Sequence, residues 1–179
     1  MDARLHHVQG KTELVSSSPA RSSGTVELLI EFYREKLHQL LQHQAHARHV
    51  SQYDANNTYQ YIINREDVQL TWLAKAIADG GGAVPDVATA VAEAREDDAA
   101  TLFKADAAGA ADFITRWRPR VDSMEHARHQ AMLRVILGET REQQRFFEQA
   151  LAGRTDLLGR RTSAAGPAQG DVLPARWIE

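Results

Sequence analysis

Two apolar helical stripes in this chain each contain an acidic residue, and this repeat constrains the fold more than any other feature. The stripes read Ile62, Glu66, Gln69, Leu73, Ala76 and Val135, Glu139, Glu142, Phe146, Ala150. Glu66 and Glu139 are 73 residues apart. A carboxylate that faces a core costs free energy unless it has a counter-charge, a proton or a metal ion. The repeat therefore predicts a duplicated helical bundle with a polar centre.

The rest of the pattern predicts four helices and almost no strand. Apolar residues recur at helical spacing, and we expect helices over about 25–50, 57–79, 98–118 and 122–152. Gly80–Gly82 and Gly153 are predicted to end the second and fourth helices, and Pro119 the third. The short loop within each pair predicts antiparallel neighbours. We therefore expect an all-α fold of two helical hairpins joined by a crossover connection.

Composition divides the chain and limits its partners. We expect a flexible leader over 1–24, the four-helix bundle over 25–153, and a tail over 154–179 that ends in an apolar peptide. The net charge of -3 favours neither nucleic acid nor an anionic membrane. The absence of Cys excludes a thiolate nucleophile. With no signal peptide or segment of membrane-spanning length, the expected location is cytoplasmic.

Six polar residues are predicted to face the centre of the bundle. On the first helix of each hairpin, one polar residue is set to face an i, i+3 pair on the second helix. The two sets are Tyr33 with Glu66 and Gln69, and Asp106 with Glu139 and Glu142. A helix register shifted by one residue would instead bring in Glu35 or His38 for Tyr33, and Gln143 for Glu142.

This layout resembles the ferritin-like superfamily, whose bundles carry a Glu on two helices and Glu-x-x-His on the other two. The resemblance covers roughly 25–153 and includes the sequence WLAKAIADGGGAVP at 72–85. It implies a degenerate di-iron carboxylate centre that binds iron or manganese. The implied metal ligands are Glu66, Asp106, Glu139 and Glu142, with Tyr33 and Gln69 as replacement ligands or as hydrogen-bond partners of the ligands. Since no His stands in the motif positions, the oxygen ligands suit hard cations better than a redox iron centre.

The histidines are predicted to lie outside this centre. His38, His43, His46 and His49 fall off the apolar stripe of the first helix, so we expect them on a solvated face. His43 with His46, His46 with His49, and His126 with His129 have the i, i+3 spacing of pairs that can share a metal ion. A solvated face is nevertheless expected for His126 and His129 as well, at the start of the fourth helix.

Two classes of function remain open. The first is a ferritin-like metal-dependent oxidoreductase or iron-handling protein. The second is a non-enzymatic bundle without metal, whose buried acids pair with basic residues. The available basic residues are Arg65, Lys75, Arg134 and Arg145. Such a bundle would form a homo-oligomer, such as a dimer, or bind a protein partner through the C-terminal tail. Neither class predicts binding to nucleic acid or to a membrane.

Overall fold

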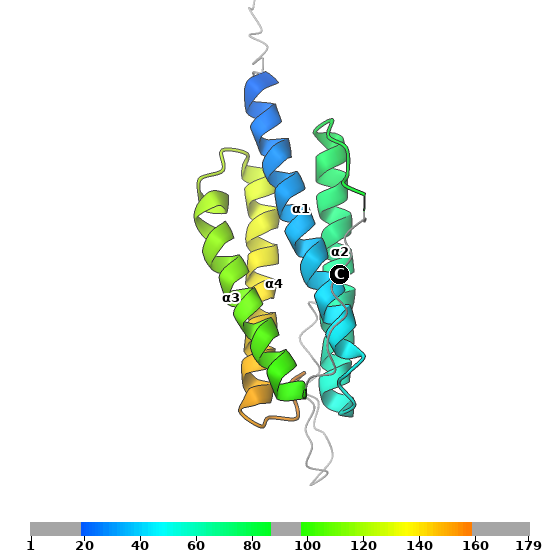
Figure 1. Ribbon diagram of the computed structural model, residues 1–179. Coiled ribbons are helices and arrows are strands. Elements are labelled where there is room, and N and C mark those ends of the chain that lie inside the picture. The colour runs from blue at the N-terminus through cyan, green and yellow to red at the C-terminus, as the bar shows by residue number, and fades with distance from the viewer. Residues whose placement is uncertain (1–18, 87–97, 159–179) are drawn as a thin grey trace, which may run out of the picture.

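The computed structural model describes residues 19–86 and 98–158, and these residues form four α-helices (Figure 1). The helices are α1 (Pro19–Ala47), α2 (Tyr53–Asp79), α3 (Ala99–Asp122) and α4 (Ala127–Leu151). No strand occurs in these two ranges, and the predicted all-α fold is confirmed. None of the described helices is both long and apolar enough to cross a bilayer.

The helices form two antiparallel hairpins, α1–α2 and α3–α4, and the closest packing lies within each hairpin. Figure 1 shows that α2 ends at one end of the bundle and that α3 begins at the other, so these two helices run parallel. The chain between them therefore crosses the length of the bundle, as predicted. Residues 87–97 of this connection lie outside the described part.

Aromatic side chains from both hairpins fill the apolar core. Phe32 of α1 packs edge-on against Phe113 and Trp117 of α3, with ring centroids 5.0 and 4.7 Å apart. Tyr59 of α2 packs against Phe147 of α4 at 5.3 Å. Because these contacts join the two hairpins, they bury the inner faces of all four helices in one core.

The Gly80–Gly82 run ends α2, as predicted, and the structure shows why glycine is required there. Gly81 has φ +79°, in the left-handed region that favours glycine. A Cβ on Gly82 would lie 2.5 Å from a methyl group of Val26, and a Cβ on Gly80 would lie 2.6 Å from its other methyl group. The run therefore lets the end of α2 approach α1 closely.

The predicted end of α3 at Pro119 is wrong. The helix continues through this proline to Asp122. Two tertiary contacts stabilise the additional turn: Val121 is fully buried, and the guanidinium of Arg120 donates two hydrogen bonds to Glu31 of α1. Tertiary packing thus outweighs the helix-breaking effect of a proline in the last turn.

The predicted start of the fourth helix at residue 122 is also wrong, because α4 begins later, at Ala127. His126 caps this helix: its ring nitrogen accepts a hydrogen bond from the backbone N–H of His129 at 3.3 Å. The carboxylate of Asp122 instead accepts a hydrogen bond from Arg134 at 2.9 Å.

The predicted outer segments fall largely beyond the described residues. Residues 1–18 of the leader and 159–179 of the tail, including the apolar terminal peptide, lie outside them. At the first boundary, α1 begins at Pro19, six residues before the predicted start at Thr25.

Candidate functional site

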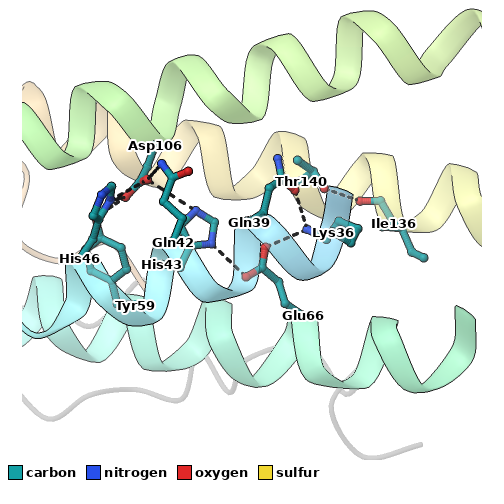
Figure 2. A network of polar contacts seen from close by, with 10 residues as sticks. All are labelled: Lys36, Gln39, Gln42, His43, His46, Tyr59, Glu66, Asp106, Ile136 and Thr140. Carbon is teal, nitrogen blue, oxygen red and sulfur yellow. Dashed lines mark hydrogen bonds and ion pairs between the residues drawn. The ribbon is translucent and has the colours of Figure 1, made fainter. Parts of the chain in front are cut away.

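Glu66 of α2 is fully buried and bonded to two cationic groups of α1 (Figure 2). The ammonium of Lys36 donates to one carboxylate oxygen at 2.7 Å, and Nδ1 of His43 lies 2.9 Å from the other. Lys36 and His43 are seven residues apart on α1, two helical turns, so both reach the same face. Burial alone would raise the pKa of Glu66, but His43 and Lys36 together lower it below its usual value.

Asp106 of α3 is the second buried acid, and it binds side chains from both helices of the other hairpin. The hydroxyl of Tyr59 donates to it at 2.5 Å, and Nε2 of Gln42 donates at 3.0 Å. Nδ1 of His46 lies 2.9 Å from Oδ1 and 2.8 Å from Oδ2 of the same carboxylate. The pKa of Tyr59 is raised far above its usual value, first by burial and then by the charge of Asp106 and the hydrogen bond from Tyr59 to Asp106. The phenol therefore remains protonated.

The imidazole of His43 lies between the two acids. Its Nδ1 is bonded to Glu66, and its Nε2 lies 3.9 Å from Oδ1 of Asp106. Burial lowers the pKa of His43, but the charge of Glu66, their hydrogen bond and the charge of Asp106 outweigh burial and raise it overall. Basic side chains of α1 thus lie against both buried carboxylates, as buried charges require: Lys36 and His43 at Glu66, and His46 at Asp106.

The predicted inward positions of α4 are shifted by one residue. The side chains of Glu139 and Glu142 are partly exposed, whereas Thr140 and Gln143 are buried. Glu139 forms an ion pair with Arg65 and accepts a hydrogen bond from Nε2 of Gln69 at 2.5 Å. The reason lies in a second apolar stripe, which is the one that α4 buries. That stripe consists of Leu133, Ile136, Leu137 and Phe147.

The other four residues that were predicted to face the centre of the bundle are buried, as expected. They are Tyr33, Gln69, Glu66 and Asp106. The structure brings Glu66 and Asp106 together around His43. Gln69 joins Glu139 at the α2–α4 contact instead.

The solvated face predicted for the α1 histidines is wrong for two of them. His43 is buried and the His46 side chain is 12% exposed, whereas His38 and His49 are exposed. A heptad repeat could have revealed this inward face. Its three members on α1 are Leu29, Lys36 and His43, and all three are buried.

His126 and His129 take no part in the buried network. Their rings stack 3.9 Å apart at the start of α4, where His126 serves as the helix cap.

Comparison with protein-family models, with curated proteins and with solved structures found no match to this chain. The four-helix bundle therefore rests on the structure itself. Membership of the ferritin-like superfamily stays a prediction from the sequence layout.

The buried residues do not fit a di-iron centre. A metal ion needs several ligand atoms that converge on one point, at about 2.0–2.6 Å. Glu66 instead holds the Lys36 ammonium and His43, and Asp106 holds hydrogen-bond donors from three side chains. Within residues 19–86 and 98–158, no three His, Asp or Glu residues are grouped to hold a metal ion.

Proposed function

We propose that this chain is a non-enzymatic helical bundle that acts by association, with a second copy of itself as the partner. One observation carries the proposal: Glu66 and Asp106, the buried acids, already have Lys36 and His43 as counter-charges. A centre neutralised from within needs no metal ion for its charge balance. The metal-dependent oxidoreductase or iron-handling protein, with iron or manganese as its cofactor, stays a sequence prediction.

Support for association comes from the side of the bundle where α2 and α4 meet. Val68 and Trp72 of α2 are 40% and 36% exposed, and Val135 of α4 is 50% exposed. The ion pair of Arg65 with Glu139 joins these two helices, and the Arg65 guanidinium lies 5.9 Å from the Trp72 ring centroid. Val68 and Trp72 lie one and two turns from Arg65, and Val135 one turn from Glu139. All three therefore share this side of the bundle. We call Val68, Trp72 and Val135 the seam patch.

A second copy is the partner that this chemistry fits. A twofold-symmetric contact places the same surface against itself, so a patch must be self-complementary. The seam patch presents apolar side chains, which bury one another. Arg65 and Glu139 beside them have opposite charges, and a twofold axis can place each near its opposite in the second copy.

The test is the mass of the purified chain by light scattering over a range of concentrations. We expect a dimer for the unchanged chain and a monomer for Trp72→Glu, because a buried unpaired carboxylate opposes association. Tyr53→Glu is the matched control. It puts the same charge on an exposed aromatic residue of α2 outside the seam patch, and it should leave the dimer intact. A monomeric unchanged chain would refute the proposal.

Metal content separates this proposal from the metal-dependent alternative. Protein from cells grown with added iron and manganese should contain neither metal in stoichiometric amounts by elemental analysis. One or two metal ions per chain would favour the oxidoreductase or iron-handling prediction. The tail is a separate matter, because the apolar peptide near residues 172–178 lies outside the described residues. Its role in binding a partner stays a prediction.

A further inference from the structure

We infer that the centre of the bundle is a cation site whose resident cation is the Lys36 ammonium, held there by covalent attachment in the place that a metal ion would take. The inference goes beyond self-association and does not depend on it. It concerns what the buried carboxylate of Glu66 can bind once the lysine is removed.

The surroundings of the ammonium are those of a cation site. Lys36 Nζ lies 2.7 Å from Oε1 of Glu66 and 3.1 Å from Oε1 of Gln39 (Figure 2). The Phe113 ring centroid is 5.6 Å away, within range of a cation–π contact. Lys36 is fully buried, although lysine normally keeps its charged group in water. A carboxylate oxygen, an amide oxygen and an aromatic face thus surround one positive charge.

The charge balance of the network explains why a cation must occupy this position. Glu66 and Asp106 are both buried. His43 lies between them, and His46 contacts Asp106 alone, so Glu66 has Lys36 and His43 as its two basic partners within the described residues. Removal of the ammonium would leave the fully buried carboxylate of Glu66 with His43 as its one basic partner in the described part of the chain, and a buried charge that loses a partner is strongly destabilised. The two oxygen atoms that bind Lys36 are of the kind that hard divalent cations prefer. A further carboxylate in place of the lysine would supply the additional ligands that such an ion needs.

The first experiment returns the missing ammonium as a separate molecule. Lys36→Ala removes three carbons and the amine, which together correspond to n-propylammonium. We expect the variant to have a lower melting temperature than the unchanged chain, and n-propylammonium to raise it by binding the folded state. The neutral analogue n-propanol should not. The control Lys36→Ala with Glu66→Gln removes the anion as well, and n-propylammonium should leave its melting temperature unchanged.

The second experiment replaces the ammonium with a metal ion. Lys36→Glu places a second carboxylate opposite Glu66, and we expect it to bind about one Mn²⁺ per chain through oxygen ligands. Lys36→Gln is the control, because glutamine has the length of the introduced glutamate without its charge. This variant should not bind Mn²⁺. Binding is measured by elemental analysis after dialysis and by the rise in melting temperature on addition of Mn²⁺.

Several outcomes would overturn the inference. One is an equal response of Lys36→Ala to n-propanol and n-propylammonium, and another is a response that persists after Glu66→Gln. The inference is also overturned if Lys36→Glu folds but does not bind Mn²⁺. It is overturned as well if the unchanged chain binds Mn²⁺ as well as this variant does. If Lys36→Ala is unfolded alone, helical circular dichroism must return with n-propylammonium, and its failure to return counts against the inference.

Discussion

Replacement of Asp106 by Asn should destabilise the bundle strongly, because this one side chain holds together elements of both hairpins. Its carboxylate accepts hydrogen bonds from Tyr59 at 2.5 Å and Gln42 at 3.0 Å, and it contacts His46 at 2.8 Å. An asparagine keeps one acceptor oxygen, turns its NH₂ group toward donors and removes a counter-charge from His43. The loss of one partner from a buried charged network costs about 3–5 kcal/mol.

This cost is a large fraction of the total stability of a domain, which is about 5–15 kcal/mol. It corresponds to a fall in melting temperature of about 6–20 °C for a chain of this size. The assay is urea unfolding followed by helical circular dichroism. Asp122→Asn is the matched control on the same helix, because Asp122 forms a solvent-exposed ion pair with Arg134. Such exposed pairs contribute about 0–1 kcal/mol. Equal losses for the two variants would refute the assignment of Asp106 as the link between the hairpins.

Two further predictions concern pH and packing. The folded-state pKa of His43 is raised from 6.5 and that of Glu66 is lowered from 4.5, despite burial, by their mutual attraction. The His43 contribution is complete below pH 6.5 and lost as pH rises through its folded pKa, and that of Glu66 is complete above pH 4.5 and lost as pH falls through its own. The free energy of unfolding should therefore fall on both sides of this window, and a flat profile in urea titrations would contradict the network. Gly82→Ala, whose Cβ would lie 2.5 Å from a Val26 methyl group, should cost about 1–3 kcal/mol in the same assay. Gly109→Ala, a helical position with no neighbouring atom within 4 Å, should instead add about 0.5–1 kcal/mol, and a reversed order would show that the close approach is not limiting.

The fold was predictable from the sequence because helix faces and glycine ends are local features. The apolar stripe of α2 and the Gly80–Gly82 run predicted the position of this helix to within a few residues. The long segment between the two hairpins indicated the crossover. The ends of α3 and α4 were not predictable in this way. They depend on tertiary contacts, such as that of Arg120 with Glu31, which no local pattern contains.

The candidate site was predictable only in part, and the reason is physical. The inward positions of Glu66 and Asp106 were predictable from their apolar neighbours. The burial of Lys36 and His43 was not predicted, because charged side chains rarely lie in a core. A lysine becomes favourable there only when a carboxylate is already present. The acids and their partners therefore have to be predicted together, from the heptad repeat of α1 and the stripe of α2.

Within the described residues, several polar contacts join the two hairpins, and this has a consequence for folding specificity. Asp106 binds α1 and α2, and Glu139 of α4 binds Arg65 and Gln69 of α2. Apolar faces alone would tolerate several rotations of one hairpin against the other, since hydrophobic contact is non-directional. Hydrogen bonds to a carboxylate have fixed directions, and a rotation that breaks them leaves a buried charge without partners. The same network that neutralises the centre thus also selects a single arrangement of the hairpins.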